Sequence, residues 1–319
     1  MTSLTLADVR AAAARIRPFI HRTPVMTSEQ LDARLGAHVF FKCENLQKTG
    51  SFKARGAHNA VYSLADADAA RGVVTHSSGN HAGALARAAQ RRGIPCTVIM
   101  PANASAVKKA AVATYGATIV ACEPTLSARE AAAAKVLVAT QGTLVHPYDD
   151  CRVVAGQGTA ALELLEDYPD LDLVLTPVGG GGLLAGTALT AKSLSPKIHV
   201  IGVEPELADD TFRSYHGTTR VVINSSTTIA DGLRGSIGER NLELLRKHVD
   251  DVVTVSEAAI IAATRLLWER MKIVVEPSSA VPLAALLNGK VKVAGLKVGI
   301  ILSGGNVDLD ALPWMRAGV

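Results

Sequence analysis

Residues 173–193 read LVLTPVGGGGLLAGTALTAKS, in which a short apolar run is followed by four glycines and then by an alanine- and leucine-rich segment. Short apolar runs with β-branched residues are typical of buried parallel strands, and the last segment has a helical composition. The backbone N–H groups of the four glycines would converge near the helix N-terminus, where they favour a phosphate group. The alternative is a merely flexible turn, and the dinucleotide-binding fingerprint is matched only poorly.

The same alternation recurs along the chain and predicts an α/β fold with helices on both sheet faces. Further strands are expected at 72–75, 96–100, 118–120, 199–203 and 298–302. Helices are expected at 82–92, 104–115, 127–140, 158–167, 183–193, 257–272 and 278–287. Residues 72–147 form a self-contained set of alternations, so we expect a small domain there, inserted into a large domain made of 1–71 and 148–319.

Composition excludes several classes of protein. The 319 residues amount to roughly two units of ~150, with 48% hydrophobic and 19% charged residues, as in compact globular chains. The net charge of +4 is scattered, so no nucleic-acid partner is expected. The uncharged run 173–191 contains Pro177 and four glycines, which makes a membrane span improbable. The four cysteines show no Cys-x-x-Cys spacing, so neither a zinc site nor a disulfide framework is expected. We therefore expect reduced thiols, which are typical of cytoplasmic proteins.

Two further turns and a lysine complete the pattern of a binding site. Ser77-Ser78-Gly79-Asn80-His81 and Ser303-Gly304-Gly305-Asn306 follow predicted strands, as the four glycines do, and in open α/β sheets ligands bind at these strand ends. Lys53 lies among small and apolar residues in Ser51-Phe52-Lys53-Ala54-Arg55-Gly56. A lone lysine is usually a surface residue, but a desolvated one can form a Schiff base. Together these parts are what pyridoxal phosphate requires.

These four motifs, in this order, resemble the fold type II pyridoxal-phosphate enzymes, whose type is the tryptophan synthase β subunit. Within that group the chain resembles the branch of serine racemases, serine/threonine dehydratases and 3-hydroxyaspartate dehydratases, from His21 to Leu309. The resemblance implies two open, mainly parallel, twisted sheets with flanking helices, and the cofactor in the cleft between the two domains. It also implies a homodimer.

The resemblance also implies roles for individual residues. Lys53 would form the Schiff base, and Ser303 would contact the pyridine nitrogen. A hydroxyl partner leaves that nitrogen largely unprotonated, which favours elimination and racemisation over transamination. The other cofactor contacts implied are Phe52 against the ring, Asn80 at the 3′ oxygen, and Gly179, Gly180, Gly181 and Gly182 at the phosphate. The implied substrate contacts are Ser77, Ser78, Asn80, His81 and Arg129.

Ser78 distinguishes members of the branch. Racemisation needs a base on each face of Cα, and in the racemases the serine before Gly-Asn-His serves the face opposite the lysine. The alternative is that Ser78 only caps the following helix or contacts the substrate carboxylate.

An acidic segment, Glu204-Pro205-Glu206-Leu207-Ala208-Asp209-Asp210, follows the strand expected at 199–203. Such a loop is usually just solvated. It resembles the segment with which serine racemases hold a divalent cation, and the matching positions are Glu204, Ala208 and Asp210. Oxygen ligands of this kind suit Mg²⁺, Mn²⁺ or Ca²⁺.

The sequence therefore predicts an ammonia-lyase that eliminates the β-hydroxyl of a small 3-hydroxy amino acid, with serine racemase activity as a second outcome through Ser78. Lys53 would remove the Cα proton and the cofactor phosphate would protonate the leaving hydroxyl. The rival activities are a catabolic threonine dehydratase without racemase activity, a β-replacement synthase of the cysteine synthase type, and a non-catalytic sensor.

Arg129 bears on the choice of substrate. It is followed by Glu130, as is the arginine with which the resembling racemases reach the distal carboxylate of a dicarboxylate. The alternative is a solvated helix residue. Gly235 departs from the pattern, because the racemases carry a serine there that shares this contact, although Arg234 lies next to it in the sequence. The expected order of preference is 3-hydroxyaspartate at least equal to L-serine, with L-threonine behind both.

Overall fold

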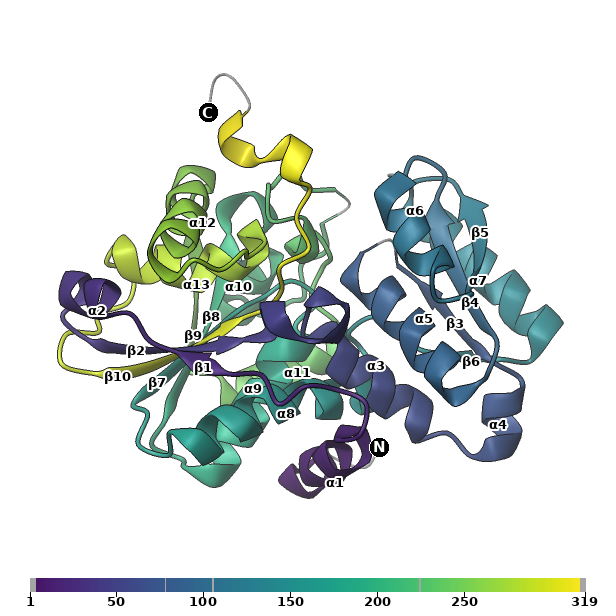
Figure 1. The fold of residues 1–319 in the computed structure, drawn as a ribbon, viewed down its shortest axis with the longest axis horizontal. Helices are drawn as coiled ribbons and strands as arrows, with labels where there is room; N and C mark the ends of the chain where they lie inside the picture. Colours follow the sequence, from purple (N-terminus) through teal and green to yellow (C-terminus); the bar gives the residue numbers. More distant parts are fainter. Residues whose placement is uncertain (1–3, 78, 105, 224, 316–319) are drawn as a thin grey trace.

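The chain forms two mainly parallel sheets with helices packed on their faces (Figure 1). In the computed structural model the residues described are 4–77, 79–104, 106–223 and 225–315. Within them, a six-stranded sheet has the spatial order β1 (Val25–Met26), β2 (His38–Cys43), β10 (Lys297–Leu302), β7 (Leu173–Pro177), β8 (His199–Pro205) and β9 (Asp251–Val255). Only the edge pair β1–β2 of this sheet is antiparallel.

A smaller sheet is wholly parallel, in the spatial order β5 (Thr118–Cys122), β4 (Cys96–Pro101), β3 (Val73–His76) and β6 (Thr143–Leu144). The two sheets confirm the predicted α/β fold class. The strands of the smaller sheet all lie within 72–147, and the proposed domain boundaries remain a prediction.

The helices were predicted less completely than the strands. The structure has α1 (Leu6–Ile16), α2 (Glu29–Leu35), α3 (Lys53–Tyr62), α4 (Asp66–Ala70), α5 (Asn80–Arg92), α6 (Ala106–Ala113), α7 (Leu126–Thr140), α8 (Cys151–Asp167), α9 (Gly182–Leu194), α10 (Asp210–His216), α11 (Glu239–His248), α12 (Glu257–Met271) and α13 (Pro277–Leu287). Sequence reasoning did not predict α3, which begins at Lys53, although apolar residues at Ala54, Ala57 and Val61 have helical spacing.

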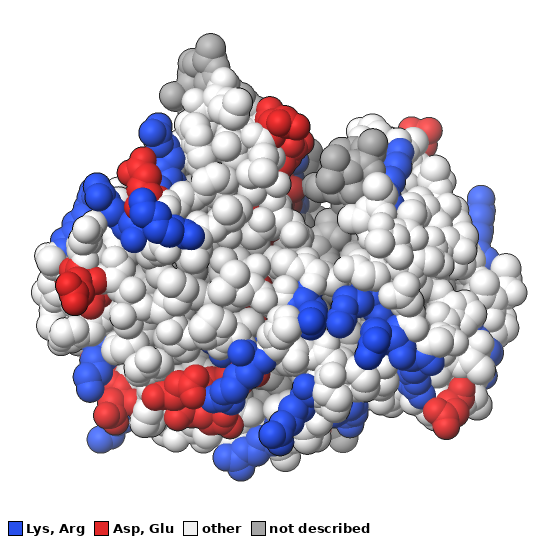
Figure 2. Space-filling model, viewed as in Figure 1, with Lys and Arg blue, Asp and Glu red and all other residues white. Residues whose placement is uncertain are grey.

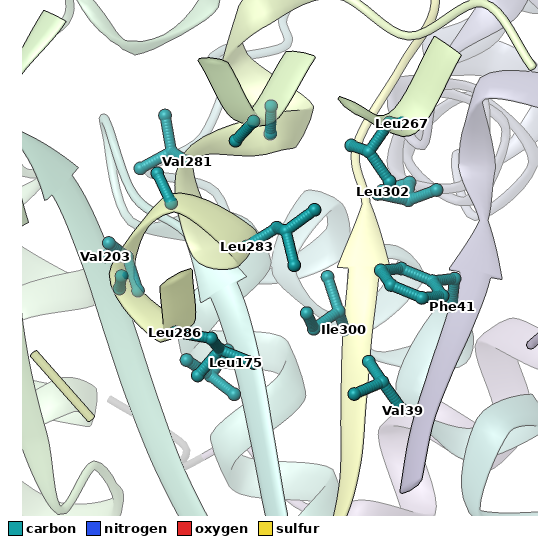
Figure 3. Close-up of a cluster of buried hydrophobic side chains, with 14 of the residues drawn as sticks. Val39, Phe41, Leu175, Val203, Leu267, Val281, Leu283, Leu286, Ile300 and Leu302 are labelled. Atoms are coloured by element: carbon teal, nitrogen blue, oxygen red, sulfur yellow. The ribbon is translucent and has the colours of Figure 1, made fainter. Parts of the chain in front are cut away.

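The core of the larger sheet has two apolar layers, one on each face. Along β10, Ile300 and Leu302 pack with α12 and α13, whereas Ile301 packs with α8, α9 and α11. This alternation is expected for a strand that is covered on both faces. Figure 3 shows the first layer, in which side chains of β2, β7, β8 and β10 meet those of α12 and α13.

Helix α3 connects the two sheets, because it packs against α5 on one side and α8 on the other. Its residues Ala57, Ala60 and Val61 belong to the same apolar cluster as β3, β4 and α5. The segment assigned to the large domain therefore also contributes to the core of the smaller sheet.

Helix α8 begins earlier than residue 158, where the sequence predicted its start, and the glycines inside the helix explain the difference. Glycine normally weakens a helix, yet α8 begins at Cys151, where the Asp150 side chain accepts the N–H of Arg152 at 2.8 Å. A Cβ on Gly156 would lie 2.5 Å from Cα of Gly56. The glycine is a point of close contact between α8 and α3.

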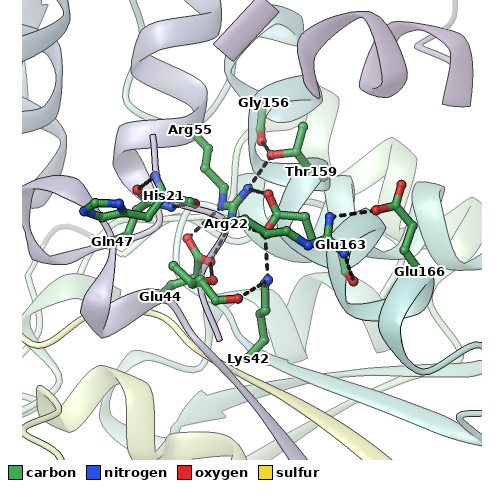
Figure 4. Close-up of polar contacts among 12 residues, drawn as sticks. His21, Arg22, Lys42, Glu44, Gln47, Arg55, Gly156, Thr159, Glu163 and Glu166 are labelled. Atoms are coloured by element: carbon green, nitrogen blue, oxygen red, sulfur yellow. Dashed lines mark hydrogen bonds and ion pairs between the residues drawn. The ribbon is translucent and has the colours of Figure 1, made fainter. Parts of the chain in front are cut away.

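A buried ion network fastens α3 at this contact (Figure 4). Arg55 is fully buried and donates to Glu44 at 2.7 and 2.8 Å, and to Glu163 of α8 at 2.8 Å through two nitrogens. Lys42 of β2 reaches the same Glu163 carboxylate at 2.6 Å. The network joins strand β2, helix α3 and helix α8.

In the described part of the chain, no helix is long and apolar enough to cross a membrane. The run at 173–191 is divided between β7 and α9.

We predict that Arg55→Met lowers the free energy of unfolding by about 3–5 kcal/mol, because it leaves buried carboxylates without their partner. Arg22→Ala is the matched control, since Arg22 pairs with Glu166 and Asp167 at the surface, where an ion pair contributes at most about 1 kcal/mol. Urea unfolding of both variants measures the difference. Equal losses for the two would contradict a structural role of the buried network.

Candidate active site

Three of the four sequence motifs, those of Lys53, Asn80 and Ser303, contact one another directly. The N–H of Phe52 donates to the Ser303 carbonyl at 2.9 Å, and Ser51 forms a bridge with Gly304. Asn306 donates to the side-chain oxygen of Asn80 at 2.9 Å, which connects the larger sheet to α5. In Figure 2 the upper outline of the molecule is notched between the two lobes. These contacts bring the segments of Lys53, Asn80 and Ser303 together, and their role as one binding site stays a prediction.

Lys53 is the first residue of α3, and its side chain is half-buried. Its amine donates to the Pro147 carbonyl at 2.8 Å and lies 5.0 Å from the ring centroid of Phe52. Burial lowers the pKa of Lys53 to about 8, and the Glu276 carboxylate opposes the shift. A substantial fraction of the amine is therefore neutral near physiological pH, as a nucleophile or base requires.

The four glycines form a turn that admits no side chain. Gly181 has a φ of +86°, and a Cβ on Gly180 would lie 2.2 Å from the ring of Tyr148. Helix α9 begins at Gly182 and has no side-chain cap, so its first N–H groups are available to an anion. Asn241 donates to the Gly180 carbonyl at 2.7 Å and fixes the turn from outside. The turn fits a phosphate group.

Ser303 is buried at the end of β10. Its hydroxyl oxygen lies 3.1 Å from that of Ser279, which in turn donates to the Gly304 carbonyl at 2.6 Å. Because the single proton of Ser279 is used there, Ser303 is the donor between the two hydroxyls. A ring nitrogen could take over this proton.

Asn80 and Glu276 form a pair that sequence reasoning missed. The Asn80 amide donates to both carboxylate oxygens of Glu276, at 3.1 and 3.0 Å, and Glu276 is 3% exposed. A glutamate between an apolar run and a helix-starting proline, as in Val275-Glu276-Pro277, is the signal that could have found it. The carboxylate holds the Asn80 amide and acts on the charge of Lys53.

Three histidines line the site in uncharged form. The nitrogen Nδ1 of His146 accepts the N–H of Asp149 at 2.9 Å, and burial lowers the pKa of His146 to about 3. Burial, and next the charge of Lys53, keeps the pKa of His81 well below its usual range. Burial and then Arg129 lower the pKa of His76, whose ring centroid lies 5.1 Å from that of His146. Sequence reasoning missed His76 and His146, although both lie at strand ends.

The structure describes some of the predicted substrate residues and not others. The Ser77 hydroxyl accepts the N–H of Gly79 at 3.4 Å, whereas Ser78 lies outside the described residues. Arg129 lies in the first turn of α7 and is half-buried. Its positive charge acts to lower the pKa of His76 and that of Tyr148. Arg234 directs its guanidinium to the Thr228 carbonyl at 3.0 and 2.7 Å, so those nitrogens already have a partner.

The acidic loop places two carboxylates together in the interior. Glu204 and Asp210 are both fully buried, and one oxygen of Asp210 has no hydrogen-bond partner among the described residues. Burial raises the pKa of Asp210 to about 6; burial and then the charge of Asp210 raise that of Glu204 well above its usual range. A cation would relieve this repulsion, so the pair fits one. The described part of the chain contains no group of three or more His, Cys, Asp or Glu side chains that could hold a metal ion.

The family of the chain follows from its match to known sequences. The model of the family described as pyridoxal-phosphate dependent enzyme matches residues 16–304. The chain belongs to this family.

Two similar proteins and one similar crystal structure indicate the kind of reaction. The chain is 51% identical to the beta-hydroxyaspartate dehydratase of Paracoccus denitrificans, over 97% of this chain and 98% of that protein. It is 46% identical to the L-threo-3-hydroxyaspartate ammonia-lyase of Saccharomyces cerevisiae, over 98% and 97%. The crystal structure of the serine racemase of Dictyostelium discoideum superposes with a TM-score of 0.92 at 49% identity, covering 97% of this chain and all of that one.

We predict that attachment of pyridoxal phosphate to the apoprotein speeds up as the pH rises and levels off above about 8, because only the neutral Lys53 amine reacts. The visible absorbance of the bound cofactor follows the rate. Glu276→Gln should move the midpoint to lower pH, since the carboxylate opposes the lowering of the pKa. A midpoint at the ordinary lysine value of about 10.4 would contradict the assignment.

Proposed function

We propose that this pyridoxal-phosphate-dependent enzyme is an ammonia-lyase that converts 3-hydroxyaspartate, and L-serine at most equally well, to an oxo acid and ammonia. The observation that carries the proposal is the position of Arg129, whose charge acts on His76 and Tyr148. The rings of both residues lie against that of His146, on which the charge of Lys53 acts. A guanidinium is matched to a carboxylate. The names of the two hydroxyaspartate-degrading relatives support the same substrate.

The residues of the chain divide the work of elimination. Bound pyridoxal phosphate supplies the electron sink for the charge that develops at the substrate Cα. The glycine turn 179–182 would hold the phosphate of the cofactor. Ser303 would donate its hydroxyl proton to the pyridine nitrogen, and Asn80 would donate its amide N–H to the 3′ oxygen. Lys53, once its amine is free, takes the Cα proton. Loss of the β-hydroxyl leaves an enamine, which hydrolyses to the oxo acid and ammonia.

Racemisation is a second outcome of the same proton removal. If the hydroxyl stays in place, a proton returned to the opposite face of Cα inverts the centre, and Ser78 is proposed as its donor. The similarity to serine racemases supports this activity.

We also propose a divalent cation held by Glu204, Asp210 and the Ala208 carbonyl, with Mg²⁺, Mn²⁺ or Ca²⁺ as candidates. The partnerless oxygen of Asp210 supports this site. A homodimer in the cytoplasm completes the proposal, and the four cysteines, all free thiols, are consistent with a reducing compartment.

Arg129→Ala tests the substrate assignment. We expect kcat/KM for 3-hydroxyaspartate to fall by roughly 10- to 100-fold more than that for L-serine, because only the dicarboxylate loses a charged partner. Steady-state kinetics with both substrates and L-threonine measure it. Lys135→Ala, an exposed cation on the same helix, is the matched control. A uniform loss, or a preference of the unmutated enzyme for threonine, would refute the dicarboxylate substrate.

Asp210→Asn tests the cation. For the unmutated holoenzyme we expect a chelator to lower the unfolding temperature by roughly 5 °C, if the cation had been present at about 100 times its Kd. The variant should not respond. Asp209→Asn is the control, because Asp209 pairs with Arg213 at the surface and should leave the response intact. An unmutated protein indifferent to chelator and to added Mg²⁺ would disprove the site.

A further inference from the structure

Tyr148 follows Pro147, whose carbonyl accepts the Lys53 amine, and its ring is held on several sides. The ring lies against Gly180, where a Cβ would be 2.2 Å away. It meets the ring of His146 edge-on, with centroids 4.5 Å apart. Its main-chain carbonyl accepts the Asn241 amide at 3.0 Å. The aromatic ring is therefore fixed beside the phosphate turn and the reactive lysine.

The hydroxyl of this fixed ring is unused by the fold. Among the described residues the hydrogen bonds of Tyr148 are made by its main chain, and the side chain is only half-buried. On one side it faces Gly235: a Cβ there would lie 3.8 Å from the hydroxyl oxygen and 3.5 Å from the ring. Because position 235 carries no side chain, the space beside the hydroxyl is left to a ligand.

The charges around Tyr148 indicate what kind of ligand would fit. Burial raises its pKa, the guanidinium charges of Arg220 and Arg129 oppose that shift, and the carboxylates of Asp149 and Asp210 add to it. The Nε–H of Arg220 donates to the Ile237 carbonyl at 2.7 Å. The Nε–H of Arg129 donates to the carbonyl of Thr125, the residue before α7, in a longer hydrogen bond of 3.4 Å. Arginine and a phenol both donate hydrogen bonds, so the group that satisfies them together is an anion, and a carboxylate suits both.

We propose that the Tyr148 hydroxyl donates a hydrogen bond to the distal carboxylate of a dicarboxylic 3-hydroxy amino acid, in the space that Gly235 leaves open and together with Arg129. Tyr148 is then a residue that determines specificity. This inference rests on the proposed function, because it assigns a second contact to the same substrate.

The test is Tyr148→Phe, which removes the hydroxyl and keeps the ring against the glycine turn. We expect the ratio of kcat/KM for 3-hydroxyaspartate to that for L-serine to fall at least about tenfold, since charge-assisted hydrogen bonds contribute about this much or more. Each stereoisomer of hydroxyaspartate is measured separately. Tyr168→Phe, a half-buried tyrosine packed on Phe40, should keep the ratio of the unmutated enzyme.

A second variant checks the location of the contact. Gly235→Ser in the Tyr148→Phe background places a hydroxyl in the same space, at ordinary contact distance from the ring, and should restore much of the lost ratio. No recovery would overturn the placement at Gly235. Equal losses on both substrates, or no loss, would overturn the role of the hydroxyl. If the unmutated enzyme does not eliminate hydroxyaspartate at all, the proposed function fails instead.

Discussion

The placement of Lys53 depends on a guanidinium buried two residues further along the same helix. Arg55 is fully buried and bonded to carboxylates from two other elements. Burying an ion pair gains little net free energy, but leaving one partner alone is very costly. Helix α3 therefore cannot slide or turn relative to α8 without breaking the network, and the close contact of Gly56 with Gly156 leaves little room for tilting. The Lys53 amine is thus positioned by a buried ion network that lies away from it on the same helix.

Around that amine, the charges are arranged so that few groups ionise. His81 and His146 have pKa values below the usual range, chiefly because they are buried, and as neutral rings they add no positive charge near Lys53. Glu276 supplies the opposing negative charge. The balance leaves the lysine pKa near 8, between a permanently charged and a permanently neutral amine, which is the range in which a group can serve both as nucleophile and as base.

The sequence predicted those parts of the site in which several neighbouring residues form a motif. The glycine turn, the Ser303 turn and Lys53 are contiguous with strand or helix signals, so local physics identifies them. Glu276 and Tyr148 carry no such signal, because their roles come from elements that meet only after folding. The start of α8 was misplaced for a related reason: Gly156 and Gly158 weaken a helix locally, and only the packing against α3 and α9 accounts for them.

The two sheets also separate the tasks of the site. The lysine, the glycine turn and Ser303 are held by the larger sheet and by α3, whereas Asn80 and Arg129 belong to helices packed on the smaller one. The glycine turn and Ser303 are thus tied to a core covered on both faces, whereas Asn80 and Arg129 are tied to a different core. A substitution on α7 changes a side chain that stands on the smaller core and leaves the glycine turn in place, since among the described residues no strand is shared by the two sheets.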